Sequence, residues 1–139
     1  MALEETIDKV ELIEKLDPEG TYLLVRHRGE YFQISVSPTD DEDNETFYRK
    51  FLDYEVYSEV LQMILPIETV IFLSGKVPEK FREAIIAHEI GESIYNREGL
   101  SRKEAHNYGV RCEDIYTGKF FDEKTREKYL KWRKENFNR

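Results

Sequence analysis

The residues best suited to chemistry begin at position 88, where the chain reads His-Glu-Ile-Gly-Glu. The surrounding stretch has apolar residues at helical spacing, and residues four apart on a helix share one face. His88 and Glu92 therefore lie on the same face, while Glu89 lies about 100° away around the helix axis. An imidazole and two carboxylates so close together form a candidate group for metal binding or acid–base work.

A second predicted helix adds another imidazole and another carboxylate. His106 and Glu113 are seven residues apart, so they lie nearly in line on one helix face. If the two helices face each other, the four side chains meet in the composition of a site for a first-row divalent metal. His106 and Glu113 are about 10.5 Å apart along an ideal helix, so both contact one ion only from opposite sides. We expect His106 to be a ligand, and Glu113 to be a fourth ligand or a partner that holds His106.

The helix face that carries His88 and Glu92 is otherwise apolar, which predicts that it packs in the core. A buried carboxylate without a partner costs several kcal/mol, and ligand-type groups on the next helix offset that cost. Gly91 and Gly109 support the same arrangement. Each is about 1 kcal/mol less favourable than alanine inside a helix, so each predicts a close approach of backbones around a small ion or substrate.

The pattern His88-Glu89-x-x-Glu92 resembles the His-Glu-x-x-His motif of zincin metallopeptidases, with glutamate in place of the second histidine. The layout of strand, Pro-containing turn, motif helix and second helix over residues 69–113 is similar to small zincin-like proteins of phages and bacteria. This stretch is about a third of the chain.

The resemblance implies that His88 and Glu92 bind the metal, and that Glu89 acts as general base on a water molecule. The third ligand is His106 or, at the interval used by gluzincin-type peptidases, Glu113. Zinc is the expected metal. Because Glu92 makes the site richer in oxygen, manganese and iron are alternatives.

Two functions follow from these residues. The first is a metal-dependent, peptidase-like hydrolase that acts on a peptide or small-molecule substrate. The alternative is a non-catalytic binding or regulatory protein on a zincin-like scaffold, with or without a metal. Without any site, Glu89 and Glu92 would be surface charges and His106 an ordinary helix histidine. A ferritin-like di-iron site is disfavoured, because it uses two Glu-x-x-His units and the chain contains none.

The elements that position these residues follow from the apolar pattern and from Gly and Pro. In the N-terminal half we expect an amphipathic helix over 3–16, a β-hairpin of strands 21–26 and 31–37, and helix over the ambiguous segment 46–65. In the C-terminal half we expect a strand at 69–73, the motif helix to about 97, a helix from Ser101 that Gly118 ends, and a last helix to about 137 that Asp122 caps. The fold class is therefore α+β, with one domain over 1–139 and the site within about 69–116.

Composition limits the classes of function. The chain has 139 residues and a net charge of −8, which disfavours binding to nucleic acid or to an acidic membrane. Cys112 is the single cysteine, so we expect a buried small residue, a reducing environment and a cytoplasmic location. We expect His27, at the hairpin tip, to be a surface histidine. A protein partner would contact the acidic loop 40–45 or the basic tail 124–139.

Overall fold

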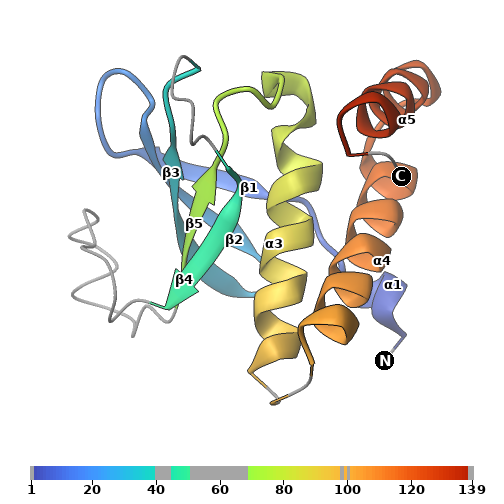
Figure 1. The fold of residues 1–139 in the computed structure, drawn as a ribbon. Helices are drawn as coiled ribbons and strands as arrows, with labels where there is room; N and C mark the ends of the chain where they lie inside the picture. Colours follow the sequence, from blue (N-terminus) through green and yellow to red (C-terminus); the bar gives the residue numbers. More distant parts are fainter. Residues whose placement is uncertain (1, 40–44, 51–68, 98, 100, 138–139) are drawn as a thin grey trace.

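A five-stranded sheet and three long helices make up the described part of the chain in the computed structural model (Figure 1). The structure describes residues 2–39, 45–50, 69–97, 99 and 101–137. The strands are β1 (Glu11–Lys15), β2 (Tyr22–His27), β3 (Glu30–Val36), β4 (Phe47–Lys50) and β5 (Thr69–Leu73). The helices are α1 (Leu3–Thr6), the 3-10 turn η2 (Glu79–Phe81), α3 (Arg82–Asn96), α4 (Arg102–Phe120) and α5 (Glu123–Phe137). The fold is α+β, as the sequence predicts.

The sheet has the strand order β1-β2-β3-β5-β4. Strands β1, β2 and β3 pair antiparallel, β5 pairs parallel to β3, and β4 pairs antiparallel to β5 at the other edge. The predicted hairpin of β2 and β3 is confirmed. Its two-residue turn holds Arg28 at φ 54° and Gly29 at φ 77°, a conformation that matches the twist of the strands it joins.

The predicted N-terminal helix over 3–16 is wrong. Helix α1 ends at Thr6, and residues 11–15 form β1, which pairs with β2 and has a bulge between Leu12 and Glu14. The Pro- and Gly-containing stretch 17–20, expected to stop a helix, is a turn between two strands. There Asp17 Oδ1 accepts a hydrogen bond of 2.8 Å from the Tyr22 N–H. A ladder of hydrogen bonds to β2 outweighs helical spacing of apolar residues.

The helical prediction for 46–65 is wrong in the part that the structure describes. Phe47–Lys50 is a strand, and the Phe47 ring stacks on Phe72 of β5 at 4.7 Å. Residues 51–68 lie outside the described residues, and so do residues 40–44 of the acidic loop.

The helical C-terminal half follows the sequence prediction. Ser101 Oγ accepts a hydrogen bond from the Glu104 N–H at the start of α4, and Asp122 Oδ1 accepts one from the Thr125 N–H at the start of α5. These are the expected N-caps. Gly118 does not end α4, which continues to Phe120.

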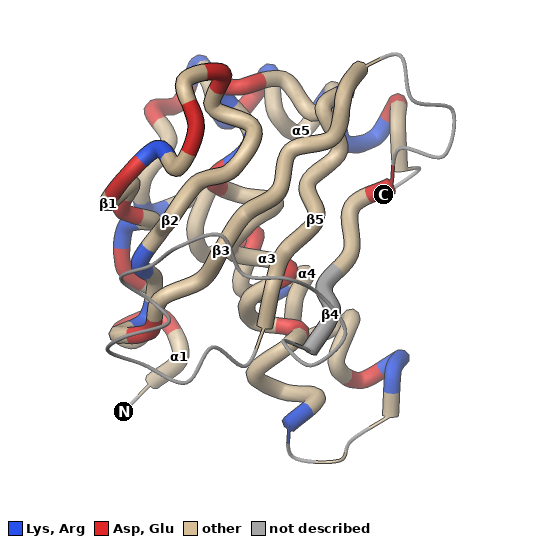
Figure 2. The backbone as a smooth tube through the Cα atoms, turned by 90° about the vertical axis from the view of Figure 1, so that its left-hand side faces the viewer, with Lys and Arg blue, Asp and Glu red and all other residues tan. Residues whose placement is uncertain are grey.

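Helix α3 lies between the sheet and α4, and α5 crosses beyond the C-terminal end of α4 (Figure 1). Charged residues occupy most of β1, whereas β3 and β5 carry few (Figure 2). No helix in the described ranges is long and apolar enough to cross a membrane.

His27 is not a surface histidine, because its side chain is completely buried. The hairpin tip packs against the N-terminal segment and α4: the Arg28 N–H donates to Asp8 Oδ1 at 2.7 Å, and its guanidinium donates to the Tyr108 hydroxyl at 3.0 Å. The His27 ring meets Tyr116 of α4 edge-on, at 6.1 Å between centroids. The local sequence predicts a hairpin turn at His27, and packing against the N-terminal segment and α4 buries its side chain.

Candidate metal centre

Two glycines let α3 and α4 approach closely. A Cβ on Gly109 would lie 2.9 Å from the His88 carbonyl oxygen and 3.0 Å from its ring Cδ2. A Cβ on Gly91 would lie 2.6 Å from Cys112 Sγ. The predicted close approach of backbones is confirmed at Gly109, and its connection with an ion or substrate stays a prediction. At Gly109 the approaching group is the candidate ligand His88, and at Gly91 it is the side chain of Cys112.

Three side chains from these helices bring potential ligand atoms together: His88, Glu92 and His106. Glu92 Oε2 lies 3.1 Å from His88 Nε2 and 3.7 Å from His106 Nδ1. Each of the three residues offers one potential ligand atom, and these atoms lie within 4.8 Å of one another. Ligand atoms around a tetrahedral zinc ion are about 3.4 Å apart, since each lies about 2.1 Å from the ion. The donor types suit such an ion, and the two distances to Glu92 Oε2, 3.1 and 3.7 Å, are close to this spacing.

The group lies where the helix pair meets the surface. His88 is buried, the Glu92 side chain is 19% exposed and the His106 side chain is 50% exposed. The His88 and His106 rings are 5.0 Å apart between centroids. The group is therefore open to solvent on the His106 side.

Glu113 is completely buried on the other side of the His88 ring. Its Oε1 accepts a hydrogen bond of 2.8 Å from His88 Nδ1, because an ionised carboxylate can only accept. Its Oε2 accepts hydrogen bonds from the Tyr129 hydroxyl and, at 2.8 Å, from Arg133 Nη1. Glu113 thus holds His88 on the neighbouring helix, whereas the sequence predicted a fourth metal ligand or a partner that holds His106.

The electrostatics of His88 follow from these contacts. Burial alone would lower its pKa, but the hydrogen bonds to Glu113 and Glu92 and the charge of Glu89 outweigh burial and raise the pKa to about 9. Without a metal, His88 is therefore an imidazolium between carboxylates at neutral pH. A metal ion that binds Nε2 must displace this proton, so binding competes with protonation.

Glu89 occupies the flank of α3 between the His88 face and the sheet. It is half-buried, and its charge reaches His88. One turn later, Ser93 Oγ lies 3.1 Å from Thr69 Oγ1 on β5, so this flank turns toward the β5–β4 edge of the sheet. Glu89 does not belong to the group of potential ligands formed by His88, Glu92 and His106.

Two residues that hold the site together were missed in the sequence. Tyr129 and Arg133 lie in the stretch 124–139, which the sequence marked as a basic tail, yet both donate to Glu113. The available signal was the predicted burial of a carboxylate on α4, which demands a donor from elsewhere. Cys112 is buried as expected, and burial raises the pKa of its thiol, so it is a packing residue.

Comparison of the chain with protein-family models, curated proteins and solved structures finds no match.

Proposed function

We propose that the protein is a metal-dependent hydrolase of the peptidase type, with a zinc ion held by His88, Glu92 and His106. The observation that carries this proposal is the convergence of His88 Nε2, Glu92 Oε2 and His106 Nδ1 at ligand spacing. A hydrogen bond from His88 Nδ1 to a buried carboxylate supports it, because metal-bound histidines usually donate their other N–H to such a group.

The chain's own residues divide the work of hydrolysis. His88, Glu92 and His106 bind the ion, and Glu113 keeps the proton of His88 on Nδ1. Glu89 takes a proton from the attacking water and returns it to the leaving group. A zinc ion bound by these residues would supply a Lewis acid for the negative charge that develops on the carbonyl oxygen.

One observation favours the alternative of a non-catalytic binding or regulatory protein. Both nitrogens of His88 already contact carboxylates, Nδ1 to Glu113 and Nε2 to Glu92 at 3.1 Å. Protonated His88 and the two carboxylates can therefore satisfy one another as a buried ion pair without a metal. The hydrolase requires that a metal displace the proton on Nε2 and that Glu89 support turnover, whereas the binding or regulatory protein requires neither.

Metal content distinguishes a metal centre from a structural ion pair. For protein purified without chelators, we expect about one zinc ion per chain by elemental analysis. His88→Ala and His106→Ala should lose it, whereas Glu104→Ala, an exposed site on α4, should keep it. Absence of metal in the unaltered protein, with no rise in melting temperature on adding Zn²⁺ or Mn²⁺, would contradict the proposal.

Turnover tests the role of Glu89. We expect Glu89→Gln to retain its zinc and to lose a factor of about 10²–10⁴ in the rate of hydrolysis of a mixed peptide pool, the range typical of general-base removal. Glu83→Gln, in the first turn of the same helix, is the control. Zinc-loaded protein that hydrolyses no peptide would instead support the binding or regulatory alternative.

A further inference from the structure

Helix α5 reaches the candidate metal centre through a single buried carboxylate. Glu113 stands between α3 and α5, with Oε1 on His88 Nδ1 and Oε2 on the Tyr129 hydroxyl and Arg133 Nη1. With Nδ1 committed as a donor, Nε2 is the nitrogen turned toward Glu92. The orientation of the Glu113 carboxylate therefore decides which ring nitrogen of His88 is available to a metal.

The two α5 donors are themselves held firmly. The Tyr129 ring is completely buried and meets Phe81 edge-on at 5.3 Å and Phe121 at 5.7 Å. Arg133 Nη1 bridges Glu113 Oε2 at 2.8 Å and Asp114 Oδ1 at 2.6 Å. Packing fixes the position of the hydroxyl, and a second carboxylate fixes the guanidinium.

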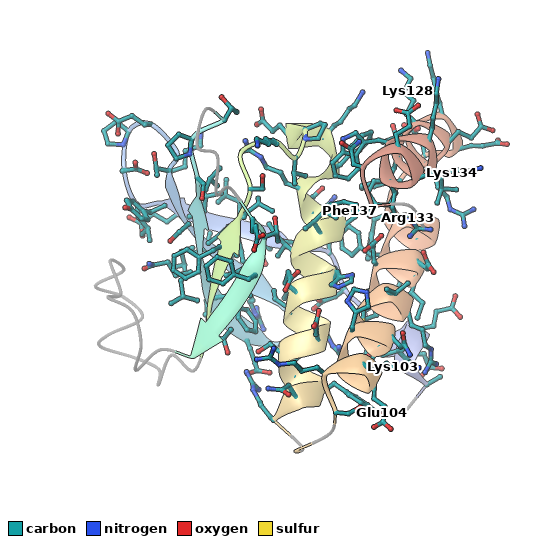
Figure 3. All side chains as sticks on the ribbon, viewed as in Figure 1. Lys103, Glu104, Lys128, Arg133, Lys134 and Phe137 are labelled. Carbon is teal, nitrogen blue, oxygen red and sulfur yellow. The ribbon has the colours of Figure 1, made fainter. Side chains whose placement is uncertain are left out.

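The side chains of α5 point in different directions. Arg133 points toward α4, whereas Lys128 and Lys134 project away from the rest of the molecule (Figure 3). The Arg133 side chain is 13% exposed, while Lys128 and Lys134 are exposed residues. Lys128 and Lys134 of this basic helix are therefore solvated, whereas Arg133 is directed inward.

We propose that Tyr129 and Arg133 are positioning residues of the metal centre, which hold His88 in its ligand orientation by fixing the carboxylate of Glu113. The inference rests on the proposed metal site. It makes α5 part of that site, although none of its side chains belongs to the group of candidate ligands.

The physical reason is the cost of an under-coordinated buried carboxylate. Without the α5 donors, Oε2 would lose two hydrogen bonds in a place that solvent does not reach, and the carboxylate would turn to find others. The His88 ring would then lose its fixed tautomer and orientation. Removal of such outer partners typically weakens metal affinity by about 10–100-fold.

The test is the zinc dissociation constant of the folded full chain, measured by competition with a chromophoric chelator at fixed pH and below the melting temperature. Tyr129→Phe keeps the ring and removes only the hydroxyl, and Arg133→Met removes the guanidinium. We expect each to weaken zinc binding by about 10–100-fold. Lys134→Met, which removes an exposed charge from the same helix, should leave the constant unchanged.

Two further readouts separate positioning from general stabilisation. Arg133→Lys should recover much of the affinity, because a single nitrogen makes both contacts of Arg133. Nitrogen NMR of the zinc-loaded protein should show His88 protonated at Nδ1 in the unaltered chain, and a loss or broadening of that signal in Tyr129→Phe. A change in folding stability alone would alter neither the tautomer nor the affinity of the folded fraction.

Normal zinc binding by the unaltered chain together with affinities within about twofold in Tyr129→Phe and Arg133→Met would overturn this inference and leave the proposed function intact. Equal weakening by Lys134→Met would also overturn it, since net charge would then be the cause. If Arg133→Met does not fold, Tyr129→Phe decides. No zinc binding by the unaltered chain would overturn the proposed function and this inference together.

Discussion

The missing Cβ of Gly109 gives His88 its place at the contact of α3 and α4. A glycine at position 109 costs helix propensity, but the space that its missing Cβ leaves is filled by the backbone and ring of His88. Gly118, on the same helix, has nothing within 4 Å of its ideal Cβ position. The two positions share one residue type and one helix, and differ only in what a methyl group would meet.

We therefore expect Gly109→Ala and Gly118→Ala to have opposite effects on the free energy of unfolding. Gly118→Ala should stabilise the protein by up to about 1 kcal/mol through helix propensity. Gly109→Ala should destabilise it by about 1–3 kcal/mol, because α4 must shift away from the His88 carbonyl oxygen, which cannot yield like a flexible side chain. Urea titration of both variants measures this. An increase in stability for Gly109→Ala would mean that the helices are further apart than described.

At the scale of elements, the N-terminal segment shows how one apolar pattern supports two structures. Ile7 and Ile13 both fit the stripe of a helix over 3–16, and both would then face the core. In the observed fold Ile7 is completely buried, whereas Ile13 lies at the bulge of edge strand β1 and is 43% exposed. The hydrogen-bond ladder to β2 fixes the segment as a strand. All five residues of β1 are exposed, so Ile13 does not face the core.

This difference predicts unequal costs of truncation. Ile7→Ala should lower the free energy of unfolding by about 2–5 kcal/mol, as expected for a large buried side chain. Ile13→Ala should change it by about 0.5 kcal/mol or less, as expected for a surface position. Thermal and urea unfolding of the two variants give the comparison, and similar losses in both would favour the helix instead of β1.

At the scale of the whole molecule, His27 joins three parts of the chain: the hairpin tip, the N-terminal segment and α4. Burial lowers the pKa of His27 to about 4, although Asp8 Oδ1, 3.1 Å from Nδ1, acts in the opposite direction. Among the described residues, Nδ1 faces only Asp8 Oδ1, and Nε2 has no hydrogen-bond partner. The fold therefore keeps this imidazole neutral.

The neutral His27 predicts a loss of stability on mild acidification. Since the ordinary pKa is 6.5 and the folded value is about 4, the unfolded chain binds the proton first as the pH falls. Stability should fall by about 2 kcal/mol between pH 7 and pH 5, and the loss should be complete below about pH 4. His27→Phe should remove this part of the pH dependence, as urea unfolding at several pH values would show.

His88 acts in a different pH window and does not obscure this result. Its folded pKa of about 9 is above the ordinary 6.5, so its contribution is fully present below about pH 6.5 and is lost as pH rises through about 9. An identical acid profile for the unaltered protein and His27→Phe would show that His27 titrates normally.

What the sequence by itself determined lies mostly in α3, α4 and the β2–β3 hairpin. Helical spacing, an N-cap at Ser101 and a two-residue turn are local features, so they predict local structure and show which side chains share a face. The same spacing places His88 and Glu92 on one face of α3, which is the face that meets His106 of α4.

Only the tertiary structure decided which side chains complete the constellation. Glu113 accepts a hydrogen bond from His88 instead of His106, and its other donors are Tyr129 and Arg133 of α5. Residues 11–15 became a strand because β2 was available as a partner. Pairing between distant segments depends on packing and on the satisfaction of buried polar groups. The spacing of residues along one element predicts neither of these.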